Sequence, residues 1–163
     1  MKYAAILGND VLDGFDGVTV SFWTQGCPFH CKGCHNQHTW DFNGGNEAEL
    51  DWIISDIKTK LVANGVQRDF SVLGGEPLCS ENFDNVMQII SSVREEFPDI
   101  IIAVWTGFTL ENLYKTYDRK KLGFFLDKID ILVDGPYKEE LRDVELAHRG
   151  SSNQRVLRKG IDF

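Results

Sequence analysis

The sequence predicts an α/β protein built on a sheet of parallel strands. Three observations predict this class: strand-like and helix-like segments alternate, short apolar runs mark buried strands, and a polar motif follows each of four strands. Alternating strands and helices form parallel sheets through right-handed crossovers, and such folds bind ligands at the carboxyl edge of the strands. Polar motifs at four strand ends therefore indicate a single site.

The first predicted strand covers residues 18–23, where β-branched and aromatic side chains dominate. Gly26 and Pro28 end this strand. Residues 24–46 then form a long loop, and loops of this length are usually functional or disordered. Because the loop contains three of the four cysteines, we interpret it as functional.

The first helix is predicted over residues 47–63, where apolar side chains line one face and Asn46 with Glu49 resembles a cap. Gly65 ends this helix. The remaining predicted elements are a strand at 70–73, a helix at 81–96, a strand at 100–105, a helix at 109–117 capped by Thr109, helical turns at 119–126, and strands at 129–133 and 155–158. The motifs that follow the four main strands are Cys27, Gly74-Gly75, Thr106-Gly107 and Asp134-Gly135.

Length and charge narrow the class of protein. With 163 residues, the chain is expected to fold as one domain spanning 1–163. Its net charge of −8 argues against nucleic acid as a partner, because phosphate binding requires a basic surface. The longest wholly apolar run, 100–105, is too short to span a membrane, and residues 1–4 lack the apolar region of a secretory signal. We therefore expect a cytoplasmic protein with no membrane partner.

The clustered cysteines, Cys27, Cys31 and Cys34, are spaced as C-x3-C-x2-C. Disulfides are rare in the cytosol, so this cluster indicates metal binding or catalysis. Thiolates favour zinc or iron–sulfur centres. A zinc site would require a fourth ligand, for which the candidates are His30, His35, His38 and Cys79. A four-iron cluster on three cysteines would instead leave one iron open for chemistry.

Further motifs extend the pattern beyond the cysteines. They are Asn36, Thr39-Trp40, Gly74-Gly75-Glu76-Pro77-Leu78, Trp105-Thr106-Gly107, Asp134-Gly135-Pro136, Leu141-Arg142-Asp143 and the block from Arg149 to Arg155. Together with the cysteine motif, they resemble the radical S-adenosylmethionine enzymes, and within them the activating proteins of the anaerobic (class III) ribonucleoside-triphosphate reductases. The cysteine spacing identifies the superfamily, whereas the Arg149 to Arg155 block and the short chain identify the activases.

The resemblance implies a fold, a cofactor and a set of ligands. The implied fold is the shortened partial (β/α) barrel of radical S-adenosylmethionine enzymes, with parallel strands. One 4Fe-4S cluster per chain is implied on Cys27, Cys31 and Cys34. S-adenosyl-L-methionine is expected at the open iron, beside Gly33, Cys34, His35, Gly74, Gly75 and Glu76. No catalytic side chain is implied beyond the cluster and the cofactor, because the cofactor carries the chemistry.

The implied activity is that of an oxidoreductase. An electron cleaves S-adenosylmethionine, and the 5′-deoxyadenosyl radical takes a hydrogen atom from a glycine of the reductase. The implied partners are the glycyl-radical subunit of the anaerobic ribonucleoside-triphosphate reductase and reduced flavodoxin or a similar electron donor. Two alternatives stay open: a related radical enzyme acting on another glycyl-radical protein or a small molecule, and an electron carrier or zinc-binding module without catalysis.

Several segments have more than one interpretation. Trp105-Thr106-Gly107 either lines an adenosine pocket or belongs partly to the core, and Asp134-Gly135 either contacts ligand or partner or forms a turn. The Arg149 to Arg155 block binds the ligand's carboxylate through an arginine fork, docks the reductase, or is a solvated turn. Cys79 is interpreted as a small buried side chain rather than a metal ligand.

Overall fold

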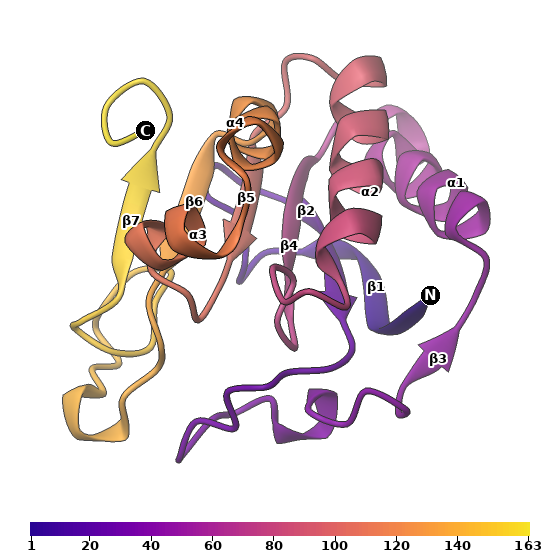
Figure 1. Cartoon of the computed structure of the whole chain (residues 1–163). Helices are drawn as coiled ribbons and strands as arrows, with labels where there is room; N and C mark the ends of the chain where they lie inside the picture. The colour runs from indigo at the N-terminus through magenta and orange to yellow at the C-terminus, as the bar shows by residue number, and fades with distance from the viewer.

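The computed structural model describes residues 1–163, and all of its strands form one mixed sheet (Figure 1). The order across the sheet is β3-β1-β2-β4-β5-β6-β7. Strands β2, β4, β5 and β6 run parallel, whereas β1, β3 and β7 pair antiparallel with their neighbours. The strand bounds are β1 (Lys2–Asp10), β2 (Thr19–Thr24), β3 (Asn46–Glu47), β4 (Asp69–Gly74), β5 (Ile102–Trp105), β6 (Ile131–Asp134) and β7 (Arg155–Arg158).

The prediction of a wholly parallel sheet is correct for the four central strands and wrong at both edges. The predicted strand at 155–158 exists, but it runs antiparallel because the chain returns from β6 without a crossover helix. Strand β1 was not predicted, because its Ala4, Ala5 and Gly8 are weak strand formers. It forms an antiparallel pair with β2, to which a short connection joins it.

Four helices lie on one face of the sheet, the near side in Figure 1. They are α1 (Leu50–Leu61), α2 (Phe83–Glu96), α3 (Leu110–Thr116) and α4 (Arg119–Lys128). Alternate strand residues such as Phe22 and Phe70 point into this layer and are fully buried against the helices. None of the helices combines the length and the apolar character needed to cross a membrane.

Two predicted helix starts have different outcomes. Thr109 caps α3 as predicted, and its hydroxyl accepts the backbone N–H of Asn112. The cap predicted for α1 is wrong, because Asn46 lies in β3 and its side chain donates to the carbonyl of Ala4 at 3.0 Å. The helix therefore begins at Leu50, later than the sequence pattern indicates.

The long loop between β2 and β3 runs below the carboxyl ends of the parallel strands (Figure 1). It folds back on its own start, where the N–H of Gly26 donates to Thr39 at 2.8 Å and the N–H of Cys27 donates to Trp40 at 3.1 Å. A short 3-10 helix at Gln37–Thr39 forms the return. The backbone around the first cysteine is therefore held by hydrogen bonds within the loop.

Arg94 ties the last turn of α2 to the amino end of β6. Its guanidinium pairs with the Asp130 carboxylate and donates to the carbonyls of Lys128, Pro98 and Ile100 at 2.8–3.0 Å. We predict that Arg94→Ala lowers the free energy of unfolding by about 2 kcal/mol, because it leaves these acceptors without their donor. Urea unfolding followed by circular dichroism measures the effect, and Lys115→Ala on the exposed face of α3 is the control. Equal unfolding midpoints for both variants would contradict it.

Candidate active site

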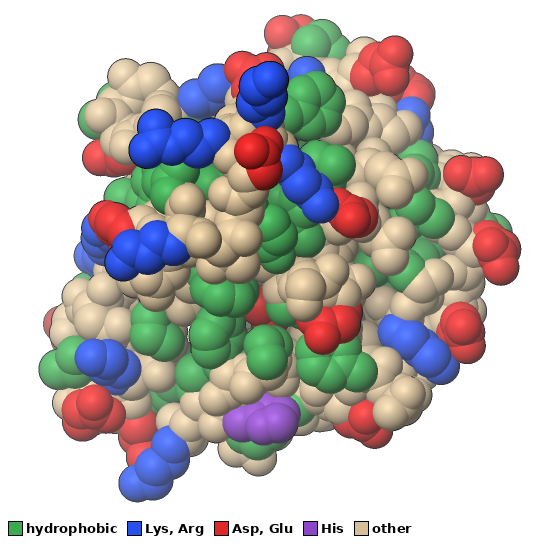
Figure 2. All heavy atoms as spheres, viewed as in Figure 1, with side chains coloured by type: hydrophobic (Ala, Val, Ile, Leu, Met, Phe, Trp, Pro, Cys, Tyr) green, Lys and Arg blue, Asp and Glu red, His purple; other side chains and the backbone are tan.

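A cavity opens at the carboxyl edge of the parallel strands, between the cysteine loop and the β6–β7 connection. Its lining includes Cys27, Cys31 and Cys34 from the loop, Gly74, Gly75 and Glu76 after β4, Trp105, Thr106 and Gly107 after β5, and Gly135, Tyr137 and Gln154 from the β6–β7 connection. The structure thus brings the motifs that follow all four parallel strands to one cavity. Figure 2, drawn from the same side as Figure 1, shows the helix-covered face of the molecule, with hydrophobic side chains across its centre and lower part and charged side chains mostly above and around them.

The three loop cysteines present free thiols to this cavity. Cys27 is buried, whereas Cys31 and Cys34 are partly exposed. Gly33 turns the chain between the last two at a φ of 75°, a conformation that favours glycine. The backbone N–H of Asn36, two residues after Cys34, donates to the sulfur of Cys34 at 3.3 Å. No three His, Cys, Asp or Glu side chains lie close enough together to hold a single metal ion.

Burial controls the protonation of these thiols. It raises the pKa of Cys27 to about 11, although the backbone N–H of Phe29 opposes the rise and the nearby Glu76 charge adds to it. The pKa of Cys31 is also raised, first by burial and then by the neighbouring Cys34. Without a metal, both groups are neutral thiols at neutral pH. Iron binding would replace the protons, and three thiols on one cavity wall match the donor set of an iron–sulfur cluster.

The alternative fourth ligands lie elsewhere. Cys79 is 2% exposed, and its thiol donates to the carbonyl of Glu76 at 3.1 Å, so it is buried as the sequence predicts. His30 is exposed and packs against Trp40, with the ring centroids 4.8 Å apart. His35 and His38 are likewise exposed and outside the cavity lining.

The Gly74-Gly75 turn lies directly against the start of the cysteine loop. The N–H of Gly75 donates to Thr24 at 2.9 Å, and the N–H of Glu76 donates to Gly26 at 2.8 Å. A Cβ atom on Gly75 would lie 2.4 Å from the carbonyl oxygen of Gly26. Gly74 has a φ of 105°, and a side chain there would meet the backbone of Thr24. Gly75 is required for the close approach of two backbones, and Gly74 is required for its backbone conformation.

Glu76 is a buried carboxyl group that faces this turn. It is 1% exposed, and its oxygens accept the Thr106 hydroxyl and the Gly107 N–H, both at 2.7 Å. Burial raises the pKa of Glu76 to about 7, although these hydrogen bonds oppose the rise. A cation bound in the cavity would favour the charged form, so this carboxyl group can match its charge to a ligand.

Other lining residues were missing from the predicted site. Phe29, between the first two cysteines, packs edge-to-face on Phe108 at 4.8 Å and covers Gly107, where a Cβ would lie 2.7 Å from its ring. Its aromatic character in the middle of the cysteine motif was the available signal. Gln154 belongs to the predicted Arg149 to Arg155 block but was not singled out within it, and Tyr137 had no local signal that distinguished it from a turn residue.

Some predicted site residues do not line the cavity. Gly33 lies against Glu139, and His35 is exposed, with its ring centroid 6.2 Å from that of Tyr137. Arg155, a predicted ligand or docking residue, pairs instead with carboxylates of the chain.

Comparison with known proteins identifies the class and then the family. A family described as a 4Fe-4S single cluster domain matches residues 12–157, which defines a protein that holds one iron–sulfur cluster. An anaerobic ribonucleoside-triphosphate reductase-activating protein of Vibrio cholerae is 36% identical over 161 residues, covering 97% of this chain and 98% of the relative. The protein of the same name from Escherichia coli K12 is 34% identical over 96% of this chain and 97% of the relative, and that of phage T4 is 31% identical over 96% and 93%. The chain belongs to the family of anaerobic ribonucleoside-triphosphate reductase-activating proteins.

The contact between Gly75 and Gly26 generates a prediction. Gly75→Ala places a methyl group against the backbone that precedes Cys27, so we expect the loop to shift, the iron content after anaerobic reconstitution to fall, and the free energy of unfolding to drop by about 2 kcal/mol. Iron analysis and urea unfolding measure both effects. The matched control is Gly123→Ala in α4, where an added Cβ meets nothing within 4 Å and should stabilise the helix by about 0.5–1 kcal/mol. Full iron content in Gly75→Ala would show that the contact does not seat the loop.

Proposed function

We propose that this chain reductively cleaves S-adenosylmethionine and generates the glycyl radical on the anaerobic ribonucleoside-triphosphate reductase. One observation carries the proposal: in a member of this family, the three cysteines of C-x3-C-x2-C and the Gly74-Gly75-Glu76 turn line the same cavity. The family relationship supports an activating enzyme, and the cavity supplies a place where cluster and substrate meet.

Cys27, Cys31 and Cys34 would hold three irons of a 4Fe-4S cluster and leave the fourth for the methionyl group. When bound, the reduced cluster would supply the one electron that splits S-adenosylmethionine into methionine and a 5′-deoxyadenosyl radical, which would become 5′-deoxyadenosine by taking a hydrogen atom from a glycine of the reductase. The chain's own residues bind and orient the substrate and exclude water. Phe29 and Trp105 contribute apolar surface to the cavity for this purpose.

Gly74, Gly75 and Glu76 would bind the methionyl amine. The two glycines let the ligand approach the backbone, and Glu76 offers a carboxyl group with a pKa of about 7 that a bound ammonium group would ionise. Thr106 and the N–H of Gly107 hold both carboxyl oxygens in place. Gly33 and His35 flank Cys34, and we propose that they contact the same ligand near the mouth of the cavity.

The arrangement of the sheet and the four free cysteines also support the proposal. Four parallel strands in an open sheet, with helices on one face, agree with a shortened partial (β/α) barrel. Four free cysteines agree with a reducing compartment, and we propose the cytoplasm. Cleavage of each S-adenosylmethionine requires one electron, for which we propose reduced flavodoxin or a similar low-potential donor.

The proposed reaction is tested by anaerobic incubation of the reconstituted protein with S-adenosylmethionine, reductant and the reductase. We expect electron paramagnetic resonance to detect a glycyl radical on the reductase. Alanine at Cys27, Cys31 or Cys34 should remove the cluster and the radical, whereas Cys79→Ser, the matched control, should keep both because Cys79 lies outside the cavity lining. A colourless protein with one zinc would support a binding module instead. Loss of the cluster in a folded Cys79→Ser variant would contradict the ligand assignment.

The transfer of the radical from this cavity to the reductase can be tested separately. A free carbon radical reacts with whatever lies near it, so we propose that the reductase closes the cavity with its glycine-bearing segment. Segment 139–145 follows the wall residue Tyr137 and exposes two apolar side chains, with Leu141 39% and Val144 80% exposed. We expect Val144→Asp to lower the yield of glycyl radical severalfold, because a carboxylate disrupts an apolar contact, and to spare dithionite-driven cleavage.

The control for this transfer is Val66→Asp. Val66 is 52% exposed and precedes the amino end of β4, whereas the cavity lies at the carboxyl ends of the parallel strands. Equal radical yields from the two variants would place the contact elsewhere. Fully coupled turnover on a short free glycyl peptide would show that no large partner is needed to enclose the radical.

A further inference from the structure

One wall of the cavity comes from the connection between β6 and β7. Gly135, Tyr137 and Gln154 line this side. The Gln154 carboxamide fixes the wall, because its Nε2 donates to the carbonyl of Gly135 at 3.1 Å and its Oε1 accepts the N–H groups of Gly150 and Ser151 at 2.9 and 3.1 Å. The wall is therefore a hydrogen-bonded unit rather than a loose loop.

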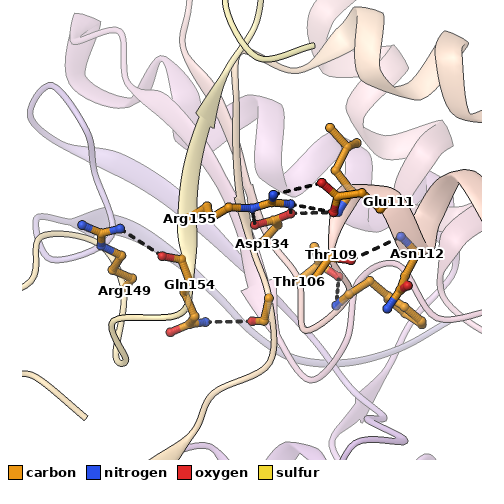
Figure 3. Close-up of polar contacts among 11 residues, drawn as sticks. Thr106, Thr109, Glu111, Asn112, Asp134, Arg149, Gln154 and Arg155 are labelled. Carbon is orange, nitrogen blue, oxygen red and sulfur yellow. Dashed lines mark hydrogen bonds and ion pairs between the residues drawn. The ribbon is translucent and has the colours of Figure 1, made fainter. Parts of the chain in front are cut away.

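Arg155 lies behind this wall, between Asp134 and Glu111 (Figure 3). Its Nε donates to Asp134 at 2.9 Å, and its two terminal nitrogens donate to the two Glu111 oxygens at 2.9 and 2.8 Å. The second terminal nitrogen also pairs with Asp134. These four contacts use four of the five N–H donors that a guanidinium carries. We call Arg155, Asp134 and Glu111 together the clamp.

The clamp joins three elements of the fold. Asp134 is the last residue of β6, Arg155 is the first of β7, and Glu111 lies in the first turn of α3. Asp134 is 0% exposed, and its Oδ2 also accepts the N–H of Leu110 at 2.8 Å. Each charged partner in the strands is next in sequence to a wall residue: Asp134 precedes Gly135, and Arg155 follows Gln154.

Arg155 and Glu111 stabilise each other's charged forms. The hydrogen bond from Arg155 lowers the pKa of Glu111 to about 2, and the pKa of Arg155 is raised by its two carboxylate partners, Asp134 first. Removing the guanidinium would leave the buried Asp134 carboxylate without its counter-charge, which is strongly unfavourable. A lysine could reach one carboxylate but not span both, because its ammonium group is a single point of charge.

The same contacts exclude a direct role for Arg155 in binding the ligand. Its side chain does not line the cavity, and its donors are engaged by the protein. Arg149 is also held internally, where it donates to the carbonyl of Gln154 at 2.9 Å. An effect of Arg155 on the ligand must therefore pass through Gly135 and Gln154.

We propose that Arg155 is a positioning residue: it holds Gly135 and Gln154 against the bound S-adenosylmethionine and so sets the affinity for this ligand without touching it. The identity of the ligand rests on the proposed function. Gly74, Gly75 and Glu76 line the same cavity from the end of β4, so a shift of the β6–β7 wall changes the space left for the ligand. The start of the cysteine loop is held by its own hydrogen bonds, from Gly26 to Thr39 and from Cys27 to Trp40.

The chain contains a matched control for this clamp. Arg94 pairs with Asp130 just before β6, at the opposite end of the strand that Asp134 terminates. Each arginine pairs with an aspartate at one end of β6, Arg94 with Asp130 and Arg155 with Asp134. Only Arg155 adjoins the wall. Arg155→Lys and Arg94→Lys therefore separate a loss of ligand positioning from a general loss of stability.

The experiment measures iron content and the dissociation constant for S-adenosylmethionine by anaerobic equilibrium binding. We expect Arg155→Lys to keep its iron and to bind about tenfold more weakly, and Arg94→Lys to bind within about twofold of the unaltered protein. If Arg155→Lys is poorly folded, Arg155→Met combined with Asp134→Asn removes both charges together and should show the same weakening. Unchanged affinity in the folded variants, or equal weakening in Arg94→Lys, overturns the proposal.

A second readout keeps this inference separate from the proposed function. If the unaltered protein with its cluster does not bind S-adenosylmethionine, the proposed function fails. Amide hydrogen exchange without ligand then decides the positioning role alone. Faster exchange at Gly135 and Tyr137 in Arg155→Lys, but not in Arg94→Lys, supports the clamp, and equal exchange in both variants overturns it.

Discussion

The cavity depends on a backbone contact that only glycine allows, between Gly75 and Gly26. The first follows β4 and the second follows β2, so the contact joins the ends of two neighbouring parallel strands. The parallel pairing of those strands fixes the height at which both turns leave the sheet. Gly26 itself lies at a φ of 94° beneath the ring of Phe42, so a side chain at either position would move the backbone that carries Cys27. The sheet therefore determines where the first thiol lies, and the loop's own hydrogen bonds place the others.

Two buried carboxyl groups near the cavity, Glu76 and Asp134, have different kinds of hydrogen-bond partner. Glu76 has only neutral donors around it, and its pKa is raised to about 7, so its charge is open to influence by a ligand. Asp134 is paired with Arg155 and with the start of α3, and it acts as a fixed part of the frame. The difference lies in the partners: Asp134 is held by a charged, forked donor, whereas Glu76 is held by hydroxyl and amide donors that carry no charge.

Local patterns in the sequence located the four parallel strands, β7, the helices and most segments that line the cavity, but not β1 or β3. The cysteine spacing, the Gly74-Gly75 pair and the polar residues after each strand are short-range signals of that kind. The pairing of Glu76 with Thr106 and of Arg155 with Asp134 and Glu111 had no such signal, because the partners are distant in sequence and no periodicity links them. The direction of β7 was missed for a related reason, since strand direction depends on how the chain returns to the sheet. Strand β1 was missed because its composition is weakly strand-forming.

The β6–β7 connection has a consequence for the order in which the site is made. During synthesis the chain grows from its amino end, and segments fold as they emerge. The three cysteines are made well before Gly75, and Gly75 well before Gln154 and Arg155. The growing chain thus carries its three loop thiols before the turn that seats the first of them exists. The wall that closes the cavity is made last. Metal capture by a nascent chain would meet flexible thiols, whereas capture by the finished chain meets a cavity whose geometry is already set.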